Sequence, residues 1–285
     1  MSLRTPLDVD VLRGRHPQHF GRPGRERQAM VAVALAGLAI LLAGMAYLGF
    51  FGGNVLPGIV KLAGIAAIML PPDPGNWAHV RIYSLSLVET VAISLLGTIV
   101  AAVLAVPLGL LAANNITTSR VLQFLTRRSL DTVRSVDILI WALIWINVVG
   151  LGPFAGVLAI MTSDLGSFGK LFSEAIEAAD RKPVEGIAST GSGRILGIRF
   201  GILPEVFPVL ASQVLYFFES NTRSATIIGI VGAGGIGQHL AEAIRTLELQ
   251  HASFIILMIL IVVGAIDFVS GRLRFAMIGQ RGAAS

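Results

Sequence analysis

Long uncharged stretches of apolar residues alternate with short polar segments along the chain. Residues 29–51 contain no charged side chain, and about 20 apolar residues suffice to cross the hydrocarbon core of a bilayer. The pattern predicts about six transmembrane helices, near residues 29–51, 83–112, 135–150, 152–172, 203–229 and 252–271. We therefore expect an all-α fold, a polytopic membrane helical bundle.

Two parts of this pattern leave alternatives. Residues 150–153, GLGP, divide one apolar stretch into two short ones. Because Pro cannot continue a helix and Gly favours a turn, we expect a tight external hairpin there, with five spans plus a re-entrant segment as the alternative. Residues 55–71 are apolar but short, carry Lys61 and are bracketed by prolines. They are expected to form an interfacial or re-entrant helix outside the membrane.

Composition agrees with a lipid environment. Hydrophobic residues make up 54% of the 285 positions and charged residues 14%, with a mean hydropathy of +0.77. A soluble domain is about 25% charged, so this chain has too few charges to cover a water-exposed surface. The sequence contains no cysteine, which excludes disulfides and thiolate metal sites within it.

The formal net charge of +5 reflects basic residues gathered in four polar segments. These segments contain Arg4, Arg13, Arg15, Arg22, Arg25 and Arg27, then Arg120, Arg127, Arg128 and Arg134, then Arg181, Lys182, Arg194 and Arg199, and finally Arg272, Arg274 and Arg281. Basic residues concentrate in the cytoplasmic loops of membrane proteins. The distribution thus predicts that all four segments and both termini are cytoplasmic, and it does not point to a nucleic-acid partner.

The longest polar interruption after the N-terminus covers residues 173–199. Its stretches EAIEAAD and VEGIAS favour helix, and Pro183 suits the first turn of the second one. Gly191 and Gly193 permit a sharp reversal before the chain returns to the bilayer at Leu203–Pro204. A docking element on the cytoplasmic face and an ordinary loop are both compatible with these features.

This segment carries a resemblance to a known motif. It is similar to the E-A-A-x-x-x-G-x(9)-I-x-L-P loop of ABC-importer permeases. Glu185, Gly191, Leu203 and Pro204 match the motif, whereas Gly186, Ile187 and Gly201 replace its other residues. Together with residues 150–160, 169–177 and 218–237, the loop resembles the phosphonate-transport permease family over roughly residues 80 to 270.

The resemblance implies a type I ABC importer of the bacterial inner membrane. In such importers two copies of the permease form the path through the bilayer, a cytoplasmic ATPase dimer binds ATP and Mg²⁺, and an extracytoplasmic phosphonate-binding protein delivers solute. The permease itself is expected to bind no cofactor, and to use this loop as the coupling helix that contacts the ATPase. By matching position, the loop residues are Glu185, Gly186, Ile187, Ala188, Gly191, Leu203 and Pro204.

The predicted spans and basic segments, together with this resemblance, suggest four parts of the chain. They are a basic cytoplasmic N-terminal segment at 1–28, a first transmembrane helix and external interfacial helix at 29–79, a permease core at 80–271 with the coupling loop at 173–204, and a cytoplasmic tail at 272–285.

A glycine-rich stretch near the end of the fifth span needs a separate interpretation. Gly232, Gly234 and Gly237 fit G-x-G-x-x-G, a dinucleotide-binding fingerprint. Such a site also needs a second strand and an acidic residue about 20 positions on, where residues 252–266 form an uncharged span instead. We therefore expect Gly232, Gly234, Gly235 and Gly237 to end the span and to permit close packing, either as a gate or as a structural turn.

The fifth span carries a polar stripe. Ser212, Tyr216, Glu219, Arg223 and Thr226 recur at helical spacing, with Ser220 and Asn221 near the edge. A polar stripe on an apolar span must face the bundle interior or a water-filled cavity. It predicts a lining of the translocation path, or alternatively a Glu219–Arg223 ion pair that only packs helices.

The remaining polar residues suggest no catalytic chemistry. Glu89, Asp137 and Asp267 are expected to form interhelical hydrogen bonds. The histidines show no metal-ligand spacing, and the sequence has neither a Walker A motif nor a catalytic constellation. We expect a non-enzymatic permease for phosphonates or a related small oxyanion. The alternatives are an importer of another solute such as methionine and an integral membrane enzyme acting on lipid.

Overall fold

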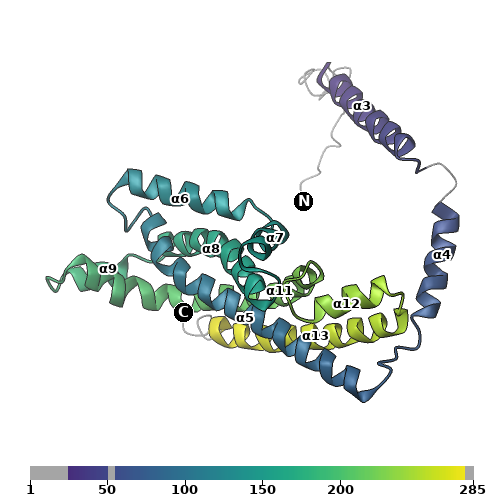
Figure 1. Cartoon of the computed structure of the whole chain (residues 1–285). Coiled ribbons are helices and arrows are strands. Elements are labelled where there is room, and N and C mark those ends of the chain that lie inside the picture. Colours follow the sequence, from purple (N-terminus) through teal and green to yellow (C-terminus); the bar gives the residue numbers. More distant parts are fainter. Residues whose placement is uncertain (1–24, 51–54, 280–285) are drawn as a thin grey trace, which may run out of the picture. The chain divides into compact units, whose positions relative to one another are not determined.

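The computed structural model describes residues 25–50 and 55–279, and its described part contains helices and no strand. The chain divides into two units, Met1–Ala67 and Ile68–Ser285. The first unit contains α3 (Arg25–Tyr47) and nearly all of α4 (Val55–Ile68) (Figure 1). The short helix predicted within residues 55–71 is therefore present.

The second unit holds the remaining helices (Figure 1). They are α5 (Trp77–Ala112), α6 (Arg120–Arg134), α7 (Ile138–Val149), α8 (Pro153–Glu177), α9 (Lys182–Ala188), α10 (Arg194–Gly197), the π-helical turn η1 (Ile198–Ile202), α11 (Leu203–Ile230), α12 (Ile236–Arg245) and α13 (Leu249–Gly279). Each predicted span contains a helix, and the all-α bundle is confirmed. The predicted boundary of the tail at residue 272 falls inside α13.

By length and hydropathy, fewer than six of the described helices qualify as membrane spans. In the described residues, Arg27–Tyr47, Trp77–Ala112, Arg194–Ile230 and Leu249–Met277 qualify singly as membrane spans. The α6–α7 pair, bent by 89°, would add a fifth. Helix α8 is long enough but carries glycines, serines, Asp164 and Lys170. Since much of α8 is buried among other helices, it does not need an apolar surface toward lipid.

Small residues bring α5 and α8 close together. Ala101 and Ala105 are fully buried on α5. A Cβ atom added to Gly97 would lie 2.7 Å from the Cβ of Ile160 on α8, and one added to Gly109 would lie 2.9 Å from the Cβ of Phe172. Such close backbone approach is typical of membrane helices, which gain van der Waals contact where side chains are small.

A tight hairpin connects α7 and α8, as the GLGP stretch predicts. Gly150 and Gly152 have φ angles of +91° and +134°, which favour glycine. Pro153 occupies the first turn of α8, where its missing N–H is not needed. The Gly152 N–H donates to the Gly232 carbonyl over 3.0 Å, so the hairpin lies against the glycine-rich turn.

Helical structure begins before residue 203, where the sequence predicts the start of the fifth span. Helical structure begins at Arg194 and continues through η1 into α11. A proline ring clashes with the carbonyl four residues earlier in an α-helix. The wider π turn, in which the Leu203 N–H donates to the Ile198 carbonyl, places Pro204 within a continuous helix.

Candidate coupling element and translocation path

Four of the predicted coupling residues, Glu185 to Ala188, lie on a short helix with two different sides. Helix α9 has Pro183 in its first turn. Val184 and Ile187 are half-buried, whereas Glu185 and Gly186 are exposed. The seven-residue helix thus packs through its apolar side and presents its acidic side outward.

The partner surface of Val184 is the π turn that leads into α11. A Cβ atom added to Gly201 would lie 3.0 Å from Val184 Cγ2, and one added to Gly197 would lie 3.4 Å from Val184 Cγ1. Gly201 is the position at which the chain departs from the isoleucine of the family motif. The absence of a side chain at Gly201 leaves room for Val184 of α9.

The reversal after α9 depends on one of the two predicted glycines. Gly191 has a φ angle of +81°, a conformation that favours glycine. Gly193 has a φ angle of −72° and precedes α10 in extended conformation. The turn is reinforced by Thr190 Oγ1 and Ser192 Oγ, which donate to the Ile187 carbonyl over 2.7 and 2.6 Å.

Arg194, at the start of α10, connects this element to the loop between α5 and α6. Its guanidinium donates to Thr118 Oγ1 over 2.7 Å and to the carbonyls of Ile116 and Asn115. One side chain thereby links the segment after α9 to the C-terminal end of α5, a role that the sequence did not indicate.

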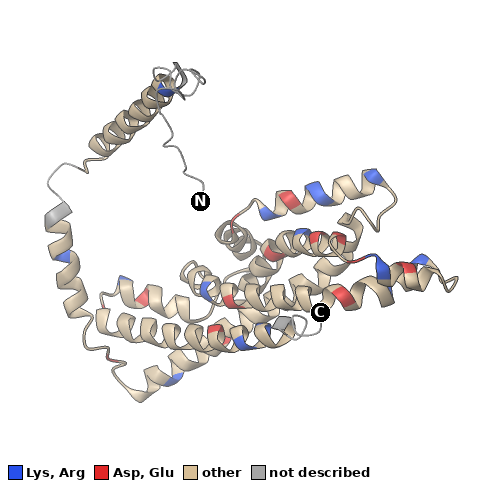
Figure 2. Cartoon of the chain, turned by 180° about the vertical axis from the view of Figure 1, so that it is seen from behind, with Lys and Arg blue, Asp and Glu red and all other residues tan. Residues whose placement is uncertain are grey.

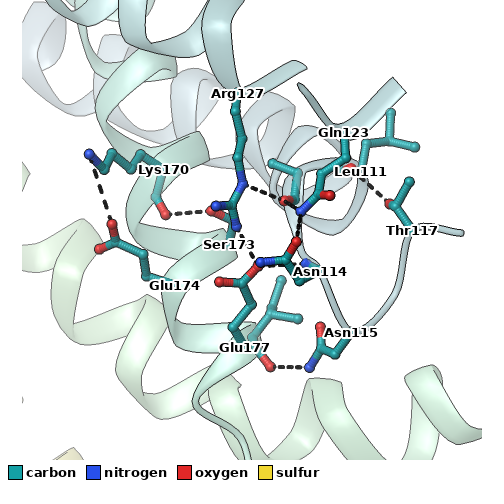
Figure 3. A network of polar contacts seen from close by, with 12 residues as sticks. Leu111, Asn114, Asn115, Thr117, Gln123, Arg127, Lys170, Ser173, Glu174 and Glu177 are labelled. Carbon is teal, nitrogen blue, oxygen red and sulfur yellow. Dashed lines mark hydrogen bonds and ion pairs between the residues drawn. The ribbon is translucent and has the colours of Figure 1, made fainter. Parts of the chain in front are cut away.

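A second set of polar contacts surrounds the same end of α5 (Figure 3). Arg127 of α6 forms an ion pair with Glu177 of α8 and donates from Nε to the Ala112 carbonyl over 2.8 Å. Glu177 also accepts from the Asn114 N–H, and Asn115 Nδ2 donates to the Ile176 carbonyl over 2.8 Å. The ends of α5, α6 and α8 are thus joined directly beside α9.

Helix α6 was expected only as a polar cytoplasmic segment. Ser119 caps it by accepting from the Leu122 N–H over 3.4 Å. Figure 2 shows basic and acidic residues along its length. Leu130 is buried against Gly169 of α8, where an added Cβ would lie 2.6 Å from Leu130 Cδ2.

The polar stripe of α11 is only partly on one surface. Tyr216 is 54% exposed, and the side chain of Arg223 is 46% exposed. Ser212 and Glu219 are partly exposed on the same side of the helix. Thr226, by contrast, is buried beneath the glycine-rich turn.

Four charged side chains connect α11 and α13, and we call them the charge ladder: Arg223, Asp267, Glu219 and Arg274. Arg223 lies 3.2 Å from Asp267 and 3.6 Å from Glu219. Arg274 lies 2.6 Å from Glu219. The predicted Glu219–Arg223 pair is therefore part of a larger network, and the interhelical bond expected of Asp267 is confirmed.

Asn221 does not lie at the edge of this surface, and its placement there was wrong. It is 5% exposed, and its Nδ2 donates to Asp164 of α8 and, over 2.8 Å, to Thr98 Oγ1 of α5. Because two residues advance an α-helix by about 200°, Asn221 faces away from Glu219.

Asp164 belongs to a buried polar cluster that the sequence analysis did not identify. It is 4% exposed, and Ser94 and Thr222 share a contact of 3.3 Å nearby in the α5–α11 interface. The available signal was an acidic residue inside the predicted span 152–172, where ionisable groups are costly.

The glycine-rich turn packs too tightly for other residues. Gly232, Gly234 and Gly235 have φ angles of +105°, +83° and +75°. A Cβ atom added to Gly237 would lie 2.0 Å from the Thr226 carbonyl oxygen. The expectation that these glycines end the span and allow close packing agrees with this geometry.

Two side chains of α5 accept hydrogen bonds from the glycine-rich turn. The Gly235 N–H donates to Glu89 Oε1 over 3.1 Å, and the Ile236 N–H donates to Thr90 Oγ1 over 2.8 Å. A glycine-rich turn before a helix favours an anion at its N–H groups. Here the chain's own Glu89 carboxylate lies at the start of α12, and it forms the interhelical bond expected of it.

The expectation for Asp137 meets a different geometry. Asp137 accepts from the Leu139 N–H over 2.8 Å and so caps its own helix, α7, because the acidic residue directly precedes the helix. His79 and His239 lie beside Tyr83, and His251 lies beside His79. No group of metal-binding residues occurs in the part of the chain that the structure describes.

Comparison with known proteins agrees with this architecture. Residues 105–277 match the family described as binding-protein-dependent transport system inner membrane component. The chain is 38% identical over 224 residues to the phosphite transport system permease protein HtxC of Stutzerimonas stutzeri, covering 79% of this chain and 78% of that protein. It is 48% identical over 118 residues to the phosphonate transport system permease protein PhnE2 of Escherichia coli, covering 41% of this chain and 97% of that protein.

A solved structure shares the fold. The chain matches an inward-facing conformation of the MetNI methionine ABC transporter with a TM-score of 0.62 and 18% sequence identity, over 71% of this chain and 99% of that one. At this identity the likeness concerns the fold alone. With the family match over most of the second unit, the chain belongs to the binding-protein-dependent transport system inner membrane components, as a multi-pass permease subunit of an ABC importer and not an enzyme.

Proposed function

We propose that this permease imports a small phosphorus oxyanion, of the phosphonate or phosphite class. The carrying observation is the similarity to permeases named for phosphite and phosphonate transport. The exposed guanidinium of Arg223 on α11 supports an anionic solute. The likeness to a methionine transporter extends only to the fold and does not favour that solute.

The proposed assembly contains two copies of this chain, an ATPase dimer that binds ATP and Mg²⁺, and an extracytoplasmic binding protein. Both termini are cytoplasmic in this proposal, since the basic segments follow the positive-inside pattern. The outward side of α9, with Glu185 and Gly186, is the surface offered to the ATPase. A short helix seated in a groove is a common mode of such contacts.

Motion of α9 would reach the path by two routes. Val184 presses on the π turn that continues into α11, and Arg194 holds the loop at the end of α5. ATP binding would draw the two α9 helices together, and the permease would change between inward- and outward-facing arrangements. The bond chemistry belongs to the ATPase, and this chain supplies a two-state element.

In this proposal the solute passes along the exposed side of α11. The lining consists of Ser212, Tyr216, Glu219 and Arg223, without the buried Asn221 and Thr226. The glycine-rich turn, which packs on the hairpin between α7 and α8, acts as the external gate.

Uptake of labelled methylphosphonate and phosphite by proteoliposomes tests the proposal. They would contain this chain, its ATPase and its binding protein. We expect ATP-dependent accumulation, reduced roughly tenfold by Glu185→Ala because a lost contact of about 1.4 kcal/mol changes an equilibrium tenfold. Glu242→Ala, which removes an exposed acid on α12, is the matched control.

Two outcomes would contradict separate parts of the proposal. Intact assembly and ATP turnover without accumulation of either anion would refute the phosphorus substrate. Uptake by Glu185→Ala equal to that of the wild type would refute the coupling role of α9.

A further inference from the structure

The charge ladder places two cations and two anions along the exposed side of α11 and α13. Glu219 and Asp267 lie within helices that qualify as membrane spans. A charged side chain costs roughly 2.5–3.5 kcal/mol at the centre of a span even on a lenient scale. Glu219 and Arg223 lie well inside the span of α11, and two charges at such positions indicate a function beyond packing.

The outer part of the charge ladder is exposed, whereas a network that only packs helices would be buried. The side chains of Arg223 and Asp267 are 46% and 41% exposed, whereas Glu219 is 13% exposed. The contact of 3.2 Å between Arg223 and Asp267 is therefore accessible to a solute from the side of α11. The inner pair, Glu219 and Arg274, is shielded.

We propose that the ladder is an anion-exchange site in which Asp267 and Glu219 compete with the transported oxyanion for Arg223. The proposal rests on the proposed function. A guanidinium binds carboxylates and phosphorus oxyanions through the same paired N–H donors. An oxyanion that reaches Arg223 can thus replace Asp267, and Asp267 can return to Arg223 when the oxyanion leaves.

Arg274 controls this competition through Glu219. Glu219 lies 2.6 Å from Arg274 and 3.6 Å from Arg223, so Arg274 holds the carboxylate nearer to itself. Arg274 also lies 5.8 Å from the ring centroid of Tyr216, which fixes the guanidinium beside the proposed path. With Glu219 held back, Asp267 is the main internal competitor at Arg223.

Substitutions of Asp267 and of Arg274 are therefore expected to change the affinity for the oxyanion in opposite directions. Asp267→Asn removes the competitor and leaves Arg223 with excess positive charge, so the oxyanion is retained longer. Arg274→Gln releases Glu219 to pair fully with Arg223, so the oxyanion is retained more weakly. A partly exposed ion pair contributes on the order of 1 kcal/mol, which corresponds to a change of roughly fivefold in each direction.

The experiment measures binding of labelled methylphosphonate and of inorganic phosphite to the assembled transporter in nanodiscs, together with uptake. We expect Asp267→Asn to bind roughly fivefold more tightly but to transport more slowly, and Arg274→Gln to bind roughly fivefold more weakly. Glu242→Gln is the control for loss of one carboxylate on an exposed helix. Tighter binding cannot arise from misfolding, so that result is specific.

A double variant separates competition from a general charge effect. If Asp267 acts through Arg223, adding Arg223→Gln to Asp267→Asn abolishes the gain in binding. Binding by Asp267→Asn equal to or weaker than that of the wild type would overturn the inference. If the wild type itself neither binds nor transports these anions, the proposed substrate fails instead.

Discussion

Position 235 requires glycine for two independent reasons. Its φ angle is +75°, and an added Cβ would lie 2.4 Å from Thr90 Oγ1. The sequence predicted a turn here from the glycine spacing alone. It could not predict the partner, because Glu89 and Thr90 lie 146 positions from their hydrogen-bond donors.

Replacing Gly235 by Ala should destabilise the permease by roughly 1–3 kcal/mol from the backbone conformation, with a further cost from the contact with Thr90. Thermal unfolding of the purified protein in detergent measures the change. Gly264→Ala is the matched control, because a Cβ there would meet nothing within 4 Å. Equal melting temperatures for both variants would show that the turn tolerates a side chain.

Which polar residues of α11 are buried could not be predicted from the sequence. Helical spacing correctly placed Ser212, Tyr216, Glu219 and Arg223 on one side of α11. It could not show that Asn221 turns toward Asp164, because that contact depends on the packing of α8 against α11. Spacing reports which residues share a face, whereas packing decides which face is covered.

At the scale of elements, an arginine ties the proposed coupling segment to a neighbouring loop. Arg194 is the described link from α10 to the loop after α5, with donors to Thr118, Ile116 and Asn115. The sequence predicted the short helix and the Gly191 turn. It missed the early start of the following helix, since a loop rich in polar residues gives no sign of a π turn.

Arg194→Gln should lower the solute transported per ATP by roughly fivefold, because losing hydrogen bonds from a charged donor costs on the order of 1 kcal/mol or more. ATP hydrolysis and uptake measured in the same proteoliposomes give this ratio. Arg199→Gln is the control, since Arg199 stacks on the adjacent Phe200 ring at 5.3 Å. A ratio unchanged by Arg194→Gln would remove this residue from the coupling route.

At the scale of the whole core, α5 reaches both functional ends. Glu89 contacts the glycine-rich turn, and Ala112 accepts from Arg127 in the polar network at the C-terminal end of α5 (Figure 3). The 23 residues between them correspond to about 35 Å of helix. The hydropathy of α5 predicted a span, but the contacts at its two ends depend on segments far away in the sequence.

We therefore expect Glu89→Gln to alter ATP hydrolysis at the opposite end of the transporter. The variant keeps a hydrogen-bond acceptor but loses a charge worth roughly 0.3–1 kcal/mol at the start of α12. ATP turnover without binding protein should rise about two- to fivefold if the contact holds one conformation. Glu242→Gln, which removes an exposed carboxylate of α12, is the matched control, and identical turnover in both variants would contradict the link.

The π turn between α10 and α11 has a consequence for how side chains are oriented along one continuous rod. A π turn joins residues five positions apart by a hydrogen bond, whereas an α turn joins residues four positions apart, so a π turn contains one extra residue. Each residue of an α-helix corresponds to about 100° of rotation about the helix axis. Arg194 and Arg223 therefore belong to a helix whose phase shifts at Ile198–Ile202. Winding the same residues as an ideal α-helix would rotate Arg194 by about 100° relative to Arg223 and away from its loop, whereas removing a single residue there would restore ideal winding and leave both ends in their present orientation.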